Sequence, residues 1–289
     1  MRRRTFVQSL AVLAASRPAG QAPSKQGEMS TASPLAAWPA DRLAAIGLQL
    51  YTVRSLMQQS VERTLEQVAA IGYKEVEFAG YFERTPTQIK TALQANGLRA
   101  PAAHVPVQSL RSAWSRTLDE AQTVGHEWVL VAWLPETDRT PDGMRAIADL
   151  FNQAGAEARR RGLRFAYHNH DFEFAPMAGG NAFDLLLSRT DPKVVEFEMD
   201  LYWITKAGGD PLAYWRKYPD RFPLVHVKDS AGPPDHRMTD VGKGKIPWAR
   251  LFSERKLAGI KHYFVEHDNP PDPLASARAS FEYLSALKV

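Results

Sequence analysis

Short apolar segments alternate along most of this chain with longer segments in which apolar residues recur every three or four positions. Runs rich in Val, Phe, Tyr or Leu are typical of buried strands, and the second spacing is that of an amphipathic helix. This alternation indicates parallel strands joined by helices. Eight strands are predicted, at Ile46–Tyr51, Glu75–Ala79, Arg99–His104, Trp128–Ala132, Arg164–Asn169, Val194–Asp200, Pro223–Lys228 and Tyr263–His267.

Each predicted strand is followed by a segment with helical character, and glycines mark several helix ends. Gly72, Gly97 and Gly162 lie where a glycine C-cap is expected. Eight βα units predict a single-domain α/β fold, the (β/α)8 TIM barrel, over residues 44–289. A doubly wound sheet would carry a glycine-rich phosphate loop after its first strand, and Tyr51 to Arg54 contain no glycine. Helical spacing is seen in Val61, Leu65 and Val68, in Met144, Ile147, Leu150, Phe151 and Ala154, and in Leu274, Ala277, Phe281 and Leu284.

The first 30 residues have the pattern of an export signal. Three arginines precede about ten mostly apolar residues, a stretch too short to span a bilayer. Arg3 and Arg4, followed by Thr-Phe-Val, resemble the twin-arginine motif. The sequence therefore predicts a signal peptide and its remnant at 1–30, a linker at 31–43, and a periplasmic protein exported through the twin-arginine pathway.

Composition and charge argue against some classes of binding partner, such as nucleic acids and membranes. The net charge of +4 comes from residues 1–30, where five basic residues face Glu28, so the remainder is close to neutral. No basic stripe follows, which argues against nucleic acid, and no apolar run is long enough for a stable membrane anchor. The chain has no cysteine, so a metal site would use His, Asp and Glu. The composition is compatible with a homo-oligomer.

Four predicted strands end at a residue that can bind a metal ion: His168, Asp200, His226 and Glu266. In a parallel barrel the C-terminal ends of the strands meet at one mouth, so these side chains could hold one divalent metal ion. Two imidazoles with two carboxylates favour Mn, Zn, Co or Fe over Mg or Ca. Asn169 and His170 compete with His168 for its position.

The segments IGLQLYTVR, IGYKEVEFAGY, YHNHDFEF, MDLYW, VHVKD and VEHD occur in this order along the chain. Together they resemble the sugar phosphate isomerase/epimerase group of xylose-isomerase-like TIM barrels, over essentially residues 44–287. The resemblance implies a metal held by Glu, Asp, His and Glu from strands five to eight. Asp200, His226 and Glu266 match the last three, and His168 replaces the fifth-strand Glu. This departure does not suit a symmetric mechanism with two glutamate bases.

Three residues at the predicted mouth are candidates for proton transfer. Glu266 is the best candidate for a general base. Lys228 follows the His226 strand, and partial desolvation near a metal would lower its pKa into a useful range. His170 lies two residues beyond His168, on the same side of an extended strand, where it could donate to substrate or orient a ligand.

Other polar and aromatic residues near the strand ends are candidates for substrate binding. Glu77 and His104 would point toward the mouth and bind sugar hydroxyls. Arg237 lies in a polar loop, Asp235–Gly244, that could close over an anionic group. Aromatic walls are common in sugar sites, although packing is the default role of any one ring. The aromatic candidates are Tyr51, Phe82, Trp133, Tyr202 and Trp203.

These observations favour a metal-dependent isomerase or epimerase that abstracts a proton beside a metal-polarised oxygen of a sugar or keto-sugar. A lyase that cleaves a 3-keto-glycoside by elimination is the alternative, and one principal base suits it. An exported sugar-binding protein without turnover is the alternative from another class. An endonuclease on the same barrel would need a basic groove and more histidine ligands.

Overall fold

A computed structural model of the protein describes residues 42–44 and 46–289. The predicted signal peptide and almost all of the linker lie outside these residues. The eight barrel strands are β1 (Ile46–Gln49), β2 (Glu75–Phe78), β3 (Arg99–Val105), β4 (Trp128–Val131), β5 (Arg164–His168), β8 (Val195–Asp200), β9 (Leu224–Val227) and β12 (His262–Val265).

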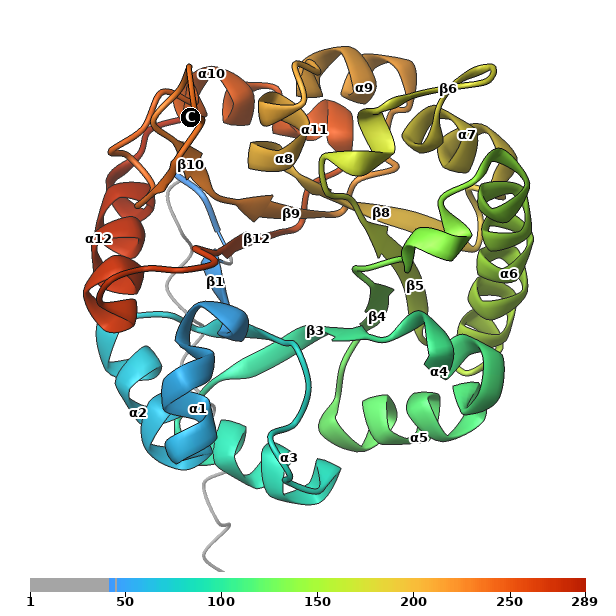
Figure 1. The fold of residues 1–289 in the computed structure, drawn as a ribbon. Helices are drawn as coiled ribbons and strands as arrows, with labels where there is room; N and C mark the ends of the chain where they lie inside the picture. The colour runs from blue at the N-terminus through green and yellow to red at the C-terminus, as the bar shows by residue number, and fades with distance from the viewer. Residues whose placement is uncertain (1–41, 45) are drawn as a thin grey trace, which may run out of the picture. The chain divides into compact units, whose positions relative to one another are not determined.

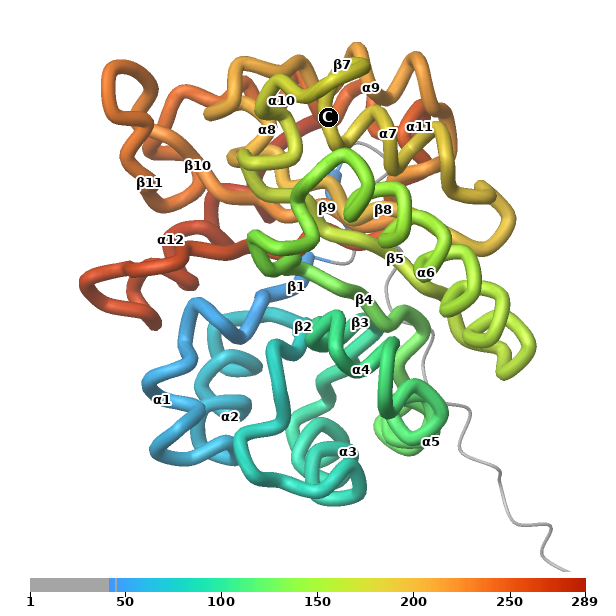
Figure 2. The backbone as a smooth tube through the Cα atoms, turned by 45° about the vertical axis from the view of Figure 1, so that its right-hand side comes forward, coloured from blue at the N-terminus to red at the C-terminus, as the bar shows by residue number. Residues whose placement is uncertain are grey.

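The eight strands close into one parallel barrel in the order β1, β12, β9, β8, β5, β4, β3, β2. Figure 1 looks down this barrel and shows the helices as a ring around it, and the turned view in Figure 2 shows the same enclosure. The predicted (β/α)8 fold is therefore confirmed. All eight predicted strands are present, with ends that differ by at most two residues.

Two predicted strands run two residues too far: the last, predicted to His267, ends at Val265, and the first, predicted to Tyr51, ends at Gln49. The first strand ends at Gln49 because the Gln49 side chain accepts a hydrogen bond from the Tyr51 amide at 3.0 Å and starts a 3-10 helix, η1 (Leu50–Val53). A side-chain acceptor that satisfies a free amide is the usual way a helix begins. The Tyr51 ring is thereby placed at the mouth rather than in the sheet.

The outer ring follows the predicted spacing. Val61, Leu65 and Val68 are fully buried on one helix, as predicted, and Pro211 is the first residue of another. The helices are α1 (Arg54–Gln59), α2 (Val61–Ile71), α3 (Pro86–Ala95), α4 (Val107–Ser112), α5 (Trp114–Val124), α6 (Pro141–Arg160), α7 (Ala182–Arg189), α8 (Leu201–Lys206), α9 (Pro211–Lys217), α10 (Trp248–Ser253), α11 (Arg255–Ala258) and α12 (Pro273–Ala286). None of the described helices is both long and apolar enough to cross a membrane.

Inside the barrel, apolar side chains separate two polar layers. This small core consists of Ala102, Trp128, Leu130, Ala166, Leu224 and Phe264. Below it, His262 bonds Glu75 through Nδ1 at 2.7 Å, and Trp128 donates to Glu196 at 2.8 Å. Above it lie the histidines and carboxylates of the mouth. The apolar layer therefore supports the candidate site from beneath.

Gly47 on β1 makes room for the ring of Phe264, which fills the barrel beneath His226. A Cβ at position 47 would lie 2.5 Å from Phe264 Cδ1. We expect Gly47→Ala to lower the free energy of unfolding by about 1–3 kcal/mol through overpacking. Urea unfolding would measure this loss, and Phe264→Leu in the same chain should relieve part of it. An unchanged unfolding midpoint in Gly47→Ala would contradict the packing described.

A buried histidine behind the barrel makes stability depend on pH. The Nδ1 of His126 donates to Ala100 O at 2.6 Å and its Nε2 accepts from the Tyr81 hydroxyl at 2.9 Å. Burial lowers the pKa of His126 to about 4. The unfolded chain therefore binds a proton first as the pH falls from about 6.5 to 4, and the folded state loses stability across that window.

We expect wild type to lose up to about 3 kcal/mol more than His126→Gln between pH 6.5 and 4, because glutamine does not titrate. Urea unfolding at several pH values would measure both proteins. Parallel pH profiles would rule out the neutral buried imidazole.

Candidate active site

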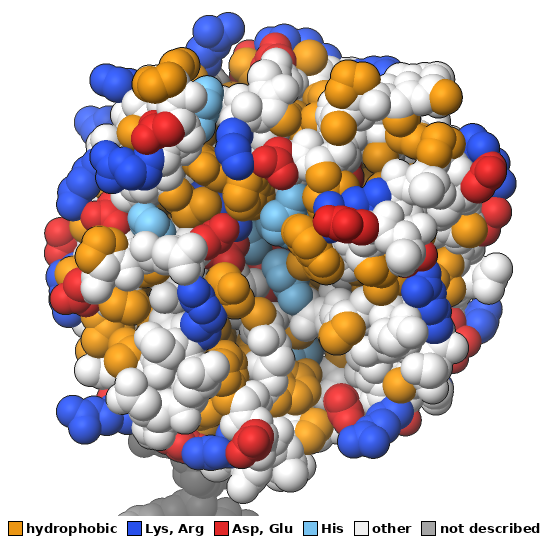
Figure 3. Space-filling view, in the orientation of Figure 1, with side chains coloured by type: hydrophobic (Ala, Val, Ile, Leu, Met, Phe, Trp, Pro, Cys, Tyr) orange, Lys and Arg blue, Asp and Glu red, His pale blue; other side chains and the backbone are white. Residues whose placement is uncertain are grey.

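The C-terminal ends of the strands surround a cavity of about 890 Å³. Figure 3 shows histidine side chains gathered in the hollow at the centre of this face. Tyr51, His104, His168, His170, Lys228 and Glu266 line the cavity, and Asp200 and His226 lie buried beside it. Six of the eight residues named here were predicted to bind metal or to act in catalysis, and the other two to bind substrate.

His168, at the end of β5, is a neutral imidazole with one nitrogen free. Its Nδ1 lies 3.0 Å from Glu198 Oε2. Burial lowers the pKa of His168 well below its usual value, and the charge on His226 lowers it further. A neutral ring that donates from Nδ1 keeps a lone pair on Nε2. That nitrogen lies 3.7 Å from Asp200 Oδ2.

His226, on β9, is held on both sides by carboxylates. Its Nε2 lies 2.7 Å from Glu77 Oε2 and 3.0 Å from Glu198 Oε2, and its Nδ1 lies 2.7 Å from Glu266 Oε2. Burial alone would lower the pKa of His226, but the surrounding carboxylates raise it well above its usual value. The Nδ1 side faces the same point as His168 Nε2, because Asp200 Oδ2 is 3.8 Å away.

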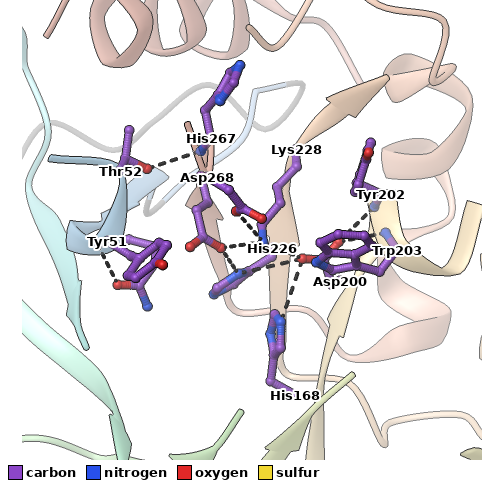
Figure 4. A network of polar contacts seen from close by, with 12 residues as sticks. Tyr51, Thr52, His168, Asp200, Tyr202, Trp203, His226, Lys228, His267 and Asp268 are labelled. Atoms are coloured by element: carbon purple, nitrogen blue, oxygen red, sulfur yellow. Dashed lines mark hydrogen bonds and ion pairs between the residues drawn. The ribbon is translucent and has the colours of Figure 1, made fainter. Parts of the chain in front are cut away.

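Asp200 has one oxygen committed to the fold and one that faces the cluster. Its Oδ1 accepts the Tyr202 and Trp203 amides at 2.9 Å each and thereby caps α8. Its Oδ2 accepts no hydrogen bond from the described residues, although the ammonium of Lys228 lies 3.1 Å away. Figure 4 shows Asp200, His168, His226 and Lys228 turned toward one another.

The donor atoms of the predicted quartet suit a divalent metal ion. Ligands held about 2.0 Å from a tetrahedral ion lie about 3.3 Å apart, and the spacings of 3.7 and 3.8 Å around Asp200 Oδ2 are close to this. Each imidazole also has its far nitrogen on a buried carboxylate, the usual support of a metal-binding histidine. Asp200, His226 and Glu266 form one group of possible ligands, and His168 shares His226 with a second group that includes His104 and Glu198.

Lys228 differs from the sequence expectation. Its ammonium lies 2.6 Å from Glu266 Oε2, 3.1 Å from Asp200 Oδ2 and 3.0 Å from Asp268 Oδ1. Burial would lower the pKa of Lys228, but these three carboxylates raise it well above its usual value. The expected lowered pKa is therefore wrong. Lys228 is a fixed cation that can donate a proton or a hydrogen bond.

His104 is the second cation of the mouth. Its Nε2 lies 2.8 Å from Glu198 Oε2 and 3.1 Å from Glu77 Oε2. Burial opposes protonation, but the two glutamates raise the pKa of His104 to about 9. Burial likewise opposes the ionisation of Glu77, whereas His104 and His226 lower its pKa to about 2. Glu77 therefore holds imidazoles and does not line the cavity, where it was predicted to bind sugar hydroxyls.

His170 is surrounded by aromatic side chains. Its ring lies 5.1 Å from the Trp133 ring and 5.5 Å from the Trp203 ring, centroid to centroid. Burial and the charge of Lys228 lower the pKa of His170 to about 3, so its imidazole is neutral. Its Nδ1 is buried and has no partner among the described residues.

Besides Glu77, four residues predicted to contact substrate lie outside the cavity wall: Phe82, Tyr202, Trp203 and Arg237. Trp203 packs against His170 and lies 5.6 Å beneath the ammonium of Lys228, without lining the cavity. Arg237 is exposed on the loop between β10 (Asp229–Ser230) and β11 (Met238–Thr239), and its amide donates to Asp235.

The two glycines of the predicted loop Asp235–Gly244, which follow β11, have a structural role. Gly242 and Gly244 donate their amides to Asp229 Oδ2 at 2.9 and 3.1 Å, and Trp248 Nε1 donates to the same oxygen at 2.9 Å. A Cβ at Gly244 would lie 2.0 Å from Asp229 Oδ1. The segment is therefore tied around a buried carboxylate, and these two amides are not free to bind a phosphate.

Glu198 is the functional residue that the sequence prediction missed. It is fully buried, and its Oε2 faces His104, His168 and His226. Because side chains alternate along a strand, Glu198 faces the same side as Asp200, two residues on. That alternation could have identified it.

Comparison with known proteins identifies relatives of this chain. Residues 65–287 match the family model described as xylose isomerase-like TIM barrel. The chain is 22% identical over 266 residues to an inosose dehydratase from Lacticaseibacillus casei, covering 78% of this chain and 89% of that protein.

Solved structures give the same fold. A sugar phosphate isomerase/epimerase from Parabacteroides distasonis superposes with a TM-score of 0.72 at 28% identity, over 83% of this chain and 96% of that one. The IolI protein with a bound zinc atom superposes with a TM-score of 0.66 at 13% identity, over 84% and 98% of the two chains, which shows the fold alone. Since the family model spans well over half of the sequence, the chain belongs to the xylose isomerase-like TIM barrel family.

Proposed function

We propose that this protein is a metal-dependent lyase that acts on a keto-sugar or a related keto-polyol. It would remove a proton from the carbon beside the carbonyl and expel a substituent from the next carbon. The observation that carries this proposal is the one-sided placement of the carboxylates that line the cavity. Its carboxylates, Glu266 and Asp268, both follow β12, whereas His104 and Lys228 are cations.

His168, Asp200, His226 and Glu266 would hold the metal. A bound divalent ion would polarise the substrate carbonyl and make the neighbouring C–H more acidic. That assistance suits Glu266, because Lys228 and His226 overcome the effect of burial and lower its pKa, so the carboxylate is ionised but weakly basic. Mn, Zn, Co and Fe suit the donor set better than Mg or Ca.

In this proposal Glu266 receives the carbon-bound proton. Both of its contacts within the described residues use Oε2, so Oε1 is the oxygen available for this proton. The electron pair of the C–H bond forms a carbon–carbon double bond, and the bond to the leaving oxygen breaks. His104 or Lys228 donates a proton to that oxygen. His170, which lines the cavity, would contact the substrate from the wall.

Isomerisation or epimerisation is the second candidate, supported by the named relative in Parabacteroides distasonis. An epimerase of the two-base kind needs a base on each face of the carbon. The carboxylates that line the cavity, Glu266 and Asp268, both follow β12, so they do not supply a charged base on each face. The inosose dehydratases among the relatives are lyases by name, which favours elimination.

Glu198→Gln should weaken metal binding by about 10–100-fold, because it removes the charge that fixes the ring of His168. Glu196→Gln is the matched control, since Glu196 lies two residues earlier on β8 and contacts Trp128 and Arg164 at the other end of the barrel. Isothermal titration with Mn²⁺, Co²⁺ and Zn²⁺ would measure both. Equal affinities in the two variants would contradict the metal site as described. Unchanged metal content in His168→Ala would contradict the role of His168 as a ligand.

Glu266→Gln should lower turnover by about 10²–10⁴-fold, the usual contribution of a general base. The substrates to try are inosose and 3-keto-glycosides, in heavy water, followed by NMR. An unsaturated ketone and a released leaving group would indicate a lyase. Deuterium incorporation without a leaving group would indicate an isomerase or epimerase. If neither occurs although the sugar binds, the protein is a binding protein.

A further inference from the structure

We propose that the outer part of the cavity is a subsite for a planar, apolar aglycone, so that the substrate is an aryl glycoside in its keto form rather than a free sugar. This inference rests on the proposed function, because the sugar ring would lie at the histidines and carboxylates of the mouth. It goes beyond that function by assigning the leaving group.

The size of the cavity is the first observation. At about 890 Å³ it lies near the upper end of the range of about 300–1,000 Å³ for pockets that hold drug-sized ligands. A single sugar ring is smaller than such ligands. A substrate with a second ring beyond the sugar would use the remaining space.

The outer wall of the cavity is mainly apolar, whereas its floor carries the charged residues of the mouth. Val105, Pro106 and Val107 line it from the β3–α4 connection, and Ala132 and Pro135 line it from the segment after β4. Arg111, at the rim, is already paired with Asp138 at 2.7 Å. Gln108 and Thr137 also line the cavity and are polar, and Gln108 Oε1 already accepts from Arg111 at 3.3 Å. The wall therefore combines a large apolar contact area with a small number of hydrogen-bonding side chains.

Two exposed aromatic rings belong to this wall. The described residues contain three large apolar side chains that are exposed, and two of them line the cavity: Trp133 at 54% and Tyr51 at 42%. The third, Leu257, is elsewhere. Exposed aromatic rings gathered at one cavity indicate a binding surface rather than chance exposure.

Each ring is held in place by an arginine. The guanidinium carbon of Arg139 lies 4.3 Å from the Trp133 ring, and Arg139 donates to Leu134 O at 2.8 and 3.0 Å. The guanidinium carbon of Arg54 lies 4.0 Å from the Tyr51 ring, and Arg54 donates to Tyr51 O at 2.8 Å. A cation covers one face of each ring, so both rings are ordered before a ligand binds.

A planar aromatic group suits these surfaces better than a second sugar. Each hydroxyl of a second sugar would need a hydrogen-bond partner once buried, and five of the wall side chains, the valines, alanine and prolines, have none to offer. A phenyl-type ring needs only apolar contact and ring stacking. We therefore assign the subsite to an aryl aglycone.

The test compares binding of matched, unoxidised ligands to the full chain. Both anomers of p-nitrophenyl glucoside, both anomers of methyl glucoside, and the disaccharides cellobiose and maltose would be titrated by calorimetry. We expect the better aryl anomer to bind at least tenfold more tightly than its methyl counterpart. Trp133→Ala and Tyr51→Ala should each reduce this ratio severalfold, and Trp133→Phe should retain most of it.

Leu257→Ala is the control for loss of an exposed apolar side chain and should leave the ratio unchanged. Thermal unfolding would establish that each variant is folded. Equal affinity for aryl and methyl glucosides, tighter binding of a disaccharide, or no binding of either aryl anomer at millimolar concentration would overturn the subsite.

The outcome is separable from that of the proposed function. Preferential aryl binding without proton exchange on keto substrates would leave the subsite standing and reject the lyase. Elimination from keto substrates with no aryl preference in binding would support the lyase and reject the subsite.

Discussion

The candidate site depends on two buried glutamates that hold histidines from behind. Glu198 and Glu77 contact the far nitrogens of His168 and His226 at 3.0 and 2.7 Å. These contacts fix which nitrogen of each ring faces Asp200 and Glu266. Because both glutamates are fully buried, rotation of either ring would take one hydrogen-bond partner away from a charge held at low dielectric. The mouth of the barrel is therefore organised before anything binds.

Much of this arrangement could be predicted from the sequence. Runs rich in Val, Phe, Tyr or Leu located all eight strands, and the His or carboxylate at the end of four of them located the quartet. The protonation state of Lys228 could not be predicted, because it depends on Asp200, Glu266 and Asp268 meeting at one point from two different strands. The end of the first strand could not be predicted either, because it is set by a single hydrogen bond from the Tyr51 amide to the Gln49 side chain. Glu198 was visible in the two-residue alternation before Asp200, but it has no motif of its own.

His168 connects the sequence analysis to the chemistry. A glutamate at this position would be a second carboxylate facing the substrate, as the family resemblance implies. An imidazole held by Glu198 is instead neutral, and it offers a lone pair rather than a negative charge. In the proposed reaction the charged base is then confined to the β12 side of the cavity, and His104 or Lys228 would supply the proton. This asymmetry is why elimination suits the geometry better than a symmetric exchange of protons.

The ammonium of Lys228 lies on the same oxygens of Asp200 and Glu266 that would bind a metal ion. In proteins whose ligands repel one another without the ion, metal binding and folding are one event. Here an internal cation already offsets part of that repulsion. If the proposed metal site is filled, the barrel would fold first and load the ion afterwards, so the bound ion would reflect the supply available at loading rather than the conditions under which the chain folded.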